Sequence, residues 1–402
     1  MKRLRNHLLA VSILAIGLSA CETVSNTGPT ETTQAKSIDA TASNYELVNR
    51  SEVVATVKSR NVAVDLERQA LEWGYTLKKK EKLDGLNLFL LTFDCPPGVD
   101  PKDASLELER LQPKSSVGEI HRYTLSSSTV SYALSNMPKT FANEMLQWPE
   151  TGCESLAKIG IIDGGLSKTF LNNTSANIHE ASFIEGISSK TATMHGTSIG
   201  AILTDPKRLK NVELYSAAVV SRDKNGNDYS SPISILKALN WMLLNDVKVV
   251  NISLSGPPNK VLESALDVAT EKGLIIVAAV GNQGQNSKPQ FPAAYQNVLA
   301  ATAVDIDGDI YRNAVRGSHV DFAAPGVDVY IKTADEDQYI SGTSIAAPFI
   351  TAAIASSSTF TDDRNRDEVI RHFSDTATDL GPKGKDNIYG LGLLNAKHIC
   401  DL

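Results

Sequence analysis

The chain has 402 residues, of which 42% are hydrophobic and 21% are charged. This composition is typical of a globular protein with a sizeable core, and the length suits two domains, so a disordered or fibrous chain is excluded. The formal net charge of -7 leaves no broad basic surface, which argues against nucleic acid as the main partner.

A secretory signal peptide is predicted at the start of the chain. Three basic residues within the first five precede an apolar run over residues 8–18, which is too short to span a bilayer well. The sequence Leu-Ser-Ala-Cys that ends at Cys21 resembles the lipobox of bacterial lipoproteins, in which the cysteine is lipidated and becomes the new N-terminus. We expect residues 1–20 to be removed and Cys21 to hold the chain on a membrane. An ordinary secretory signal followed by a chance cysteine is the alternative.

The stretch after the lipobox is expected to be a flexible tether. Residues 22–44 are rich in Thr, Ser and Ala and nearly lack large apolar side chains, so residues 21–45 are assigned no fold. Glu22 stands where an aspartate is associated with retention in the inner membrane, which favours an outer-membrane or periplasmic anchor. The sequence therefore predicts export to the cell envelope.

Three cysteines remain after the lipobox, at positions 95, 153 and 400. An exported protein folds in an oxidising compartment, and an odd number of thiols there leaves at least one unpaired within the chain. A disulfide between Cys153 and Cys400 is one pairing that the sequence leaves open.

A small α+β domain is predicted over residues 46–125, where the pattern gives the order strand, helix, strand, strand, helix, strand. The helices are expected at residues 65–73, with Gly74 ending the helix, and at residues 103–111. Residues 86–93 form an apolar, strand-like run after an Asp-Gly turn.

Short apolar runs alternate with helical stretches through residues 155–402. The runs cover residues 158–162, 212–220, 247–254, 274–280 and 298–304. Continuous runs of this length are typical of parallel strands that are buried on both faces. Apolar residues within 261–269 repeat at helical spacing, which predicts a helix with one face on the sheet. The sequence therefore predicts an α/β domain of three layers around a mostly parallel central sheet.

Three short motifs supply the groups for nucleophilic catalysis. Asp163 lies where a buried strand gives way to glycines, His195 opens a His-Gly-Thr-Ser motif, and Ser344 lies at the expected start of a helix. A serine hydroxyl is a poor nucleophile unless an imidazole accepts its proton, and the imidazole needs a carboxylate to fix its tautomer. Each motif alone also occurs as a turn or a helix cap, but their order along the chain is that of subtilisin.

The chain over residues 155–397 resembles the subtilisin-like serine peptidases. The resemblance implies that Asp163, His195 and Ser344 form the catalytic triad. It also implies that Asn282, in the motif Ala-Ala-Val-Gly-Asn-Gln-Gly, donates to the oxyanion together with the backbone N–H of Ser344.

The same resemblance implies where a polypeptide substrate binds. The segment Val-Asn-Ile-Ser-Leu-Ser-Gly-Pro at residues 250–257 is similar to the family strand that pairs with extended substrate. Together with positions next to Asn282, it gives the expected substrate-binding residues Ser253, Leu254, Ser255, Gly256, Ala279 and Gly281. These motifs place no charged side chain in the first specificity pocket, which holds the substrate side chain next to the cleaved bond. We therefore expect this pocket to accept apolar side chains.

Some residues depart from the family pattern or suggest other sites. Ser198 stands where many relatives carry a second histidine, and Gly164 stands where serine or threonine is common; neither change removes a catalytic group. The acidic run at residues 305–309 alternates carboxylates but has no full ligand loop, so we expect a surface turn and no required metal or cofactor. Three further histidines of this region lie outside any triad-like motif and are expected to be structural or at the surface: His179, His319 and His372.

The order of the two domains resembles that of subtilisin-like peptidases, whose prodomains assist folding and block the cleft until they are cleaved. The resemblance implies that residues 46–125 form a ferredoxin-like prodomain acting as an intramolecular inhibitor. A permanent domain is the alternative, because no feature of the linker at residues 126–154 identifies a cleavage point. Cleavage in the linker would leave the lipid anchor on the prodomain and free the catalytic domain.

The predicted function is therefore serine endopeptidase activity on polypeptides at the bacterial cell envelope, through an acyl-enzyme intermediate. The rival hypothesis is a catalytically silent envelope binding protein on the same fold, since a fold does not fix a function. Retention of the triad and of Asn282 favours the enzyme.

Overall fold

The computed structural model describes residues 45–126, 129–131, 137–333, 337–358 and 365–400. The predicted signal peptide, the lipidated Cys21 and the tether up to residue 44 lie outside these ranges and stay predictions. Within the described ranges, no helix is long and apolar enough to cross a membrane.

The first folded part, residues 46–125, is called here the N-terminal unit. Its main elements are β1 (Glu52–Val57), α1 (Arg60–Glu72), β2 (Thr76–Leu83), β3 (Leu88–Asp94), α2 (Pro101–Leu111) and β4 (Ser115–Glu119). The strands form an antiparallel sheet in the ferredoxin-like order β2-β3-β1-β4. Both helices begin earlier than the sequence pattern predicts, because Ser59 and Asp100 cap them by accepting hydrogen bonds from backbone N–H groups.

The sheet of the N-terminal unit is apolar on both faces. Val53 and Ala55 of β1 pack with α1 and α2 in a core that belongs to this unit. Val54, Leu88 and Leu90 point to the opposite face and are buried in the large core that the rest of the chain forms. The N-terminal unit therefore uses the apolar sheet face formed by β1 and β3 to bind the remainder of the molecule, and the burial of apolar surface drives this contact.

The larger part of the chain is built on a seven-stranded sheet in which every described neighbour is parallel. In spatial order its strands are β19 (Phe322–Pro325), β18 (Leu299–Val304), β17 (Ile275–Ala279), β15 (Val249–Ile252), β8 (Ile159–Asp163), β12 (Glu213–Ala218) and β9 (Asn177–Ser182). The mostly parallel sheet predicted from the sequence is confirmed.

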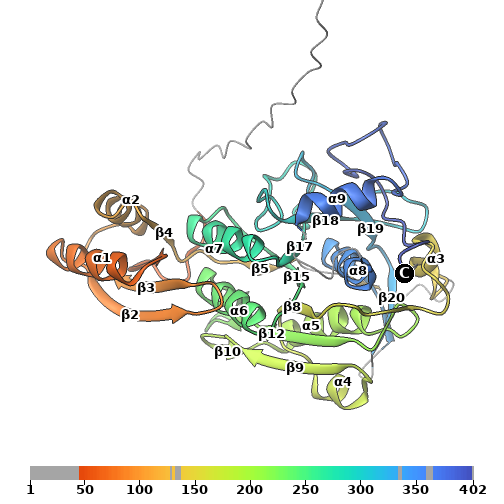
Figure 1. The fold of residues 1–402 in the computed structure, drawn as a ribbon, viewed down its shortest axis with the longest axis horizontal. Helices are drawn as coiled ribbons and strands as arrows, with labels where there is room; N and C mark the ends of the chain where they lie inside the picture. The colour runs from red at the N-terminus through yellow and green to blue at the C-terminus, as the bar shows by residue number, and fades with distance from the viewer. Residues whose placement is uncertain (1–44, 127–128, 132–136, 334–336, 359–364, 401–402) are drawn as a thin grey trace, which may run out of the picture. The chain divides into compact units, whose positions relative to one another are not determined.

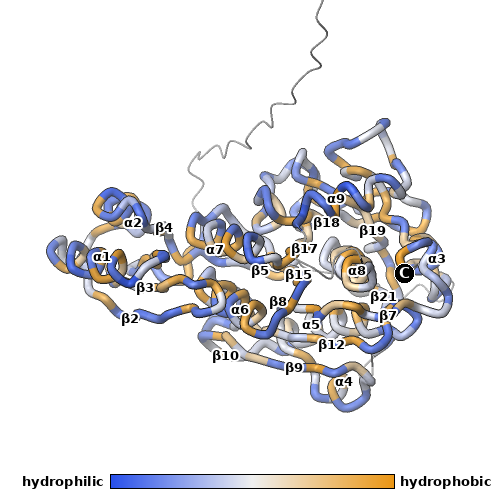
Figure 2. Tube along the Cα trace, in the orientation of Figure 1, coloured by the Kyte–Doolittle hydropathy of each residue, from blue (hydrophilic) through white to orange (hydrophobic). Residues whose placement is uncertain are grey.

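Helices cover both faces of this sheet and give three layers (Figure 1). One layer contains α5 (Lys190–Leu203) and α8 (Thr343–Ser356), and the other contains α6 (Pro232–Leu244) and α7 (Lys260–Glu271). Figure 2 shows that the hydrophilic colour follows β2, the edge strand of the N-terminal unit, whereas the central strands are hydrophobic. All of α8 is buried, so this helix runs through the core.

Smaller elements complete the described chain. They are β5 (Thr124–Leu125), β6 (Thr129–Ser131), α3 (Phe141–Met145), β7 (Cys153–Glu154), α4 (Lys168–Asn173), β10 (Ile187–Ser188), β11 (Leu209–Lys210), β13 (Ser221–Arg222), β14 (Asp228–Tyr229), β16 (Leu254–Ser255), β20 (Val329–Lys332), β21 (Asp337–Ser341) and α9 (Arg366–Ser374). Of these, β6 pairs antiparallel with β21, and β7 pairs parallel with β11.

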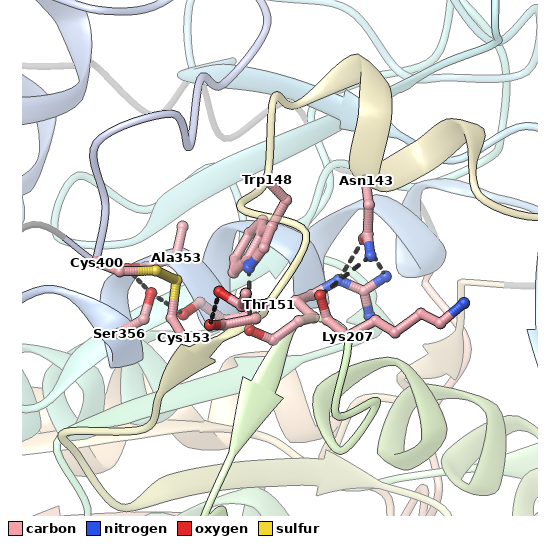
Figure 3. The surroundings of a disulfide bond; sticks show 11 residues. Asn143, Trp148, Thr151, Cys153, Lys207, Ala353, Ser356 and Cys400 are labelled. Atoms are coloured by element: carbon pink, nitrogen blue, oxygen red, sulfur yellow. Dashed lines mark hydrogen bonds between the residues drawn. A yellow bond between two sulfur atoms is a disulfide. The ribbon is translucent and has the colours of Figure 1, made fainter.

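The range predicted as a linker contains ordered structure that packs on the larger part of the chain. Trp148 is buried and donates a hydrogen bond from Nε1 to the carbonyl of Arg208 at 3.0 Å. Cys153 forms a disulfide with Cys400, which is the pairing that the sequence left open (Figure 3). The start and the end of the larger part are thereby joined covalently, while Cys95 in the N-terminal unit forms no disulfide.

Candidate active site

The site forms where β8 comes close to α5. Asp163 ends β8 and is fully buried. A Cβ atom on Gly164 would lie 2.0 Å from the carbonyl oxygen of Ala192, and one on Gly196 would lie 2.7 Å from that of Gly164. These two glycines let the helix touch the strand end in this chain. A side chain at either position would push α5 away from Asp163.

The close approach brings the imidazole of His195, on α5, against the carboxylate of Asp163. The distances from Nδ1 to Oδ1 and Oδ2 are 2.9 and 3.1 Å. On the other side of the ring, Nε2 lies 3.1 Å from Oγ of Ser344 at the start of α8. The structure thus places the three predicted residues in one hydrogen-bonded chain, although they are far apart in the sequence.

The electrostatics of His195 suit a general base. Burial lowers the pKa of this imidazole, but the charge of Asp163, the hydrogen bond to Asp163 and, less, the backbone of Ser126 together raise the pKa more, so the net shift is upward. The carboxylate therefore stabilises the imidazolium that would form if His195 took a proton from Ser344.

Asn282 lies beside the start of α8, in the loop after β17. Its Oδ1 accepts hydrogen bonds from the backbone N–H of Thr343 at 3.0 Å and from the Thr343 hydroxyl at 2.8 Å. The two hydrogen bonds from Thr343 to Oδ1 orient the carboxamide of Asn282, and Nδ2 is its donor end. The backbone N–H of Ser344 belongs to the first turn of α8, where N–H groups have no partner within the helix.

The expected substrate-binding segment is occupied by the chain itself. Residues 123–126, called here the cleft strand, lie antiparallel to it, with Leu125 paired with Leu254 and Thr124 paired with Ser255. The N–H of Ser126 donates to the carbonyl of Ser253 at 2.9 Å. The cleft strand ends with the carbonyl oxygen of Ser126 3.0 Å from Oγ of Ser344.

Tyr123 anchors the other end of the cleft strand. Its N–H and C=O exchange hydrogen bonds with Ser230 at 3.0 and 2.7 Å, so the strand is held on both edges. Its ring lies over Gly256, where a Cβ atom would come within 2.5 Å of a ring carbon. Its fully buried hydroxyl donates to the carbonyl of Pro257 at 2.7 Å. The glycine at position 256 is therefore needed to make room for a large side chain.

The two remaining expected substrate-binding positions lie at the end of β17. Ala279 is its last residue and is fully buried. Gly281 follows in the left-handed backbone region, with a φ of 97°, and its N–H lies 3.2 Å from the Thr343 hydroxyl oxygen. The structure thus sets both residues next to the loop that carries Asn282.

Other residues singled out in the sequence lie outside the triad. His179 stacks on Tyr215 at the sheet edge, and His372 packs against Phe373 on α9. Ser198 donates to the carbonyl of Met194 within α5. His319 is buried in the loop before β19, and Asp305 accepts from the N–H groups of residues 307 and 309, so its carboxylate closes a turn. Among the described residues, no group of three or more His, Cys, Asp or Glu side chains could hold a metal ion.

Sequence reasoning missed the cleft strand and Thr343. Thr343 lies directly before the predicted nucleophile, so the neighbourhood of Ser344 was the only signal for it. The cleft strand carries no motif, and it lies at the end of the domain predicted over residues 46–125.

The comparisons with known proteins agree with this geometry. Residues 155–392 match the subtilase family of peptidases. The alkaline protease of Alkalihalobacillus alcalophilus is 34% identical over 256 residues, which cover 60% of this chain and 63% of that protein. Subtilisin BL of Lederbergia lenta is 33% identical over 256 residues, which cover 60% of this chain and 89% of that protein.

Two solved structures share the fold. Fervidolysin from Fervidobacterium pennivorans, described as a keratinolytic enzyme related to subtilisin, superposes with a TM-score of 0.65 at 15% identity, covering 89% of this chain and 63% of that one. The epidermin leader peptide processing serine protease of Staphylococcus aureus gives a TM-score of 0.61 at 15% identity, covering 88% of this chain and 98% of that one. At these identities the structures support the fold alone.

The family match and the sequence relatives place the chain among the serine-type endopeptidases. It belongs to the subtilase family, because the family match covers more than half of the chain.

Proposed function

We propose that this subtilase is made as an inactive precursor and cuts its own chain between Ser126 and Ser127. One observation carries the proposal: the carbonyl oxygen of Ser126 lies 3.0 Å from Oγ of Ser344, while that Oγ lies 3.1 Å from Nε2 of His195. A peptide carbonyl, a nucleophile and a base therefore stand in reacting order, with the peptide held as a strand.

The steps follow from these positions. Ser344 Oγ attacks the carbonyl carbon of Ser126 while His195 Nε2 takes the hydroxyl proton, and Asp163 holds the charged imidazole. The oxyanion accepts hydrogen bonds from Asn282 and from the N–H of Ser344. His195 then gives the proton to the leaving amine of Ser127. Water releases Ser126 from the acyl-enzyme by the same steps, and the same cycle acts on other polypeptides.

The N-terminal unit fits the role of an intramolecular inhibitor. After the cut, the cleft strand still covers the site through its backbone pairing with β16 and Ser230. The apolar sheet face of the unit and its polar contacts, such as Gly85 N–H to Asn240 Oδ1 at 2.8 Å, hold it in place. Full activity therefore requires the N-terminal unit to leave or to be degraded.

The proposal extends to the cell envelope. If Cys21 carries the lipid, cleavage after Ser126 leaves the anchor on the N-terminal unit, and the catalytic part is released once that unit dissociates. The order of the segments in the chain supports this proposal.

The activity is tested with a fluorophosphonate probe, which reacts only with an activated serine nucleophile. We expect the self-cleaved protein, once the N-terminal unit has been removed, to hydrolyse casein and to take up the probe on Ser344, as mapped by peptide mass spectrometry. A His195→Ala chain should do neither. Folded wild-type protein that ignores both probe and casein, even after limited proteolysis has removed the N-terminal unit, would favour the rival binding-protein hypothesis.

Loss of the oxyanion donor should slow chemistry without weakening substrate binding. We expect Asn282→Ala to lower kcat about 100- to 1,000-fold on a peptide substrate with little change in KM, the loss typical of one removed oxyanion donor. Asn297→Ala is the control, because Asn297 is an exposed surface residue paired with Asp267. If Asn282→Ala lowers kcat by less than about threefold, Asn282 does not stabilise the oxyanion.

A further inference from the structure

The residue before Tyr123 makes contacts that the reaction does not require. Arg122 lies just upstream of the cleft strand, and its guanidinium Nη2 is 3.0 Å from Oδ2 of Asp223. The guanidinium carbon also lies 4.6 Å from the ring centroid of Tyr229, in cation–π geometry. The Arg122 and Asp223 side chains are only 14% and 15% exposed, so this ion pair is largely shielded from water.

The carboxylate of Asp223, which accepts from Arg122, is oriented by the hairpin of β13 and β14 that carries it. Oδ1 of Asp223 accepts from the backbone N–H groups of Asn225 and Asn227, both at 2.9 Å. These hydrogen bonds, that of Asn227 first, and the neighbouring Arg122 lower the pKa of Asp223. The carboxylate is therefore charged and oriented, and its second oxygen faces the position of Arg122.

The other charged residues near Asp223 do not prevent its carboxylate from binding a basic side chain of a substrate. Arg222, next in sequence, is bound to Asp228 at 2.7 Å instead. Glu46 is the other acid near Arg122, at 3.9 Å, but it belongs to the N-terminal unit and leaves with it. Asp223 and Tyr229 stay with the catalytic part after the cut at Ser126, whereas Arg122 departs.

The position of Tyr123, one residue after Arg122, fixes the register of a polypeptide bound in the cleft. The residue at the position of Tyr123 is held by two backbone hydrogen bonds to Ser230, and the strand pairs with β16 on its other edge. A substrate in the same register therefore brings the side chain of its fifth residue before the cleaved bond to Asp223.

We propose that Asp223 and Tyr229 form a subsite for a basic side chain, so that the enzyme selects polypeptides with arginine or lysine five residues before the cleaved bond. This inference rests on the proposed function, because it counts from the bond after Ser126. The substrate class is then a polypeptide with a basic residue followed by a tyrosine or similar aromatic residue, then two further residues and a small residue at the cut.

The test uses the self-cleaved protein after removal of the N-terminal unit and a quenched fluorescent peptide of residues 119–130. We expect replacement of the arginine in this peptide by alanine to lower kcat/KM roughly 5- to 30-fold, the range for loss of a shielded charged hydrogen bond and a ring contact. In the Asp223→Asn enzyme, which keeps an oxygen for the hairpin N–H groups, the two peptides should differ less than about twofold. A control peptide changes Thr124 to lysine, because that side chain is exposed, and should leave kcat/KM nearly unchanged.

The outcomes separate this inference from the proposed function. Casein hydrolysis with equal kcat/KM for the arginine and alanine peptides would overturn the subsite and leave the peptidase standing. A preference that persists in Asp223→Asn would overturn the role of Asp223. No hydrolysis of casein or of either peptide would overturn both, since there would be no substrate to select.

Discussion

A chain carrying Ser344→Ala is expected to stay in one piece and to lose peptide hydrolysis by about a million-fold, because the group that attacks the carbonyl is gone. The wild-type chain should separate into two fragments under the same conditions. The fold should survive the change, since the hydrogen bonds of the removed hydroxyl within the described part of the chain go to His195 and the Ser126 carbonyl. Denaturing gels and intact mass follow the cut, and a quenched peptide follows turnover.

Ser356→Ala is the matched control for this experiment. Ser356 is also a buried serine on α8, but it lies at the far end of the helix and hydrogen-bonds only to carbonyls of that helix. It should self-cleave at the wild-type rate. Cleavage of the Ser344→Ala chain at the same bond, in the absence of other proteases, would contradict the assignment of the nucleophile.

The second large effect is expected at Asp163. An asparagine there keeps the size of the side chain but favours the wrong tautomer of His195, and such a change lowers kcat about 10,000-fold in a triad. The protein should still fold, and the fluorophosphonate probe should label Ser344 far more slowly.

The same substitution should also move the pH dependence. His195 acts as a base only when it is neutral, so wild-type kcat/KM falls as the pH drops through the raised pKa of His195. Burial lowers this pKa, and Asp163 outweighs that effect. Without the charge of Asp163 the pKa should fall, and the acid limb of the profile should move to lower pH. An acid limb that stays in place, measured from pH 5 to 9, would show that Asp163 does not set this pKa.

The central strands, and the proximity of Asp163, His195 and Ser344, could be predicted because their signals are local motifs and apolar runs. Buried parallel strands are continuous apolar runs, and each of the predicted runs contains a strand of the central sheet. The edge strand β9 was missed, because its sequence Asn-Ile-His-Glu-Ala-Ser is polar at most positions, as suits a half-exposed edge. The other edge strand, β19, lies outside the predicted apolar runs.

The cleft strand could not be predicted, because its role depends on tertiary placement. Nothing in Tyr-Thr-Leu-Ser distinguishes it from other short segments of the chain. It becomes a candidate substrate only when β16, Ser230 and Ser344 surround it. For the same reason the contact between Arg122 and Asp223 has no signal in the sequence.

If Ser344 cuts the bond after Ser126, the intact mass of the self-cleaved wild-type protein will show where the two fragments meet. We expect an N-terminal fragment that ends at Ser126 and a second fragment that begins at Ser127, with both absent from the Ser344→Ala chain. Fragments that meet at another bond, or a folded wild-type chain that stays whole, would contradict this expectation.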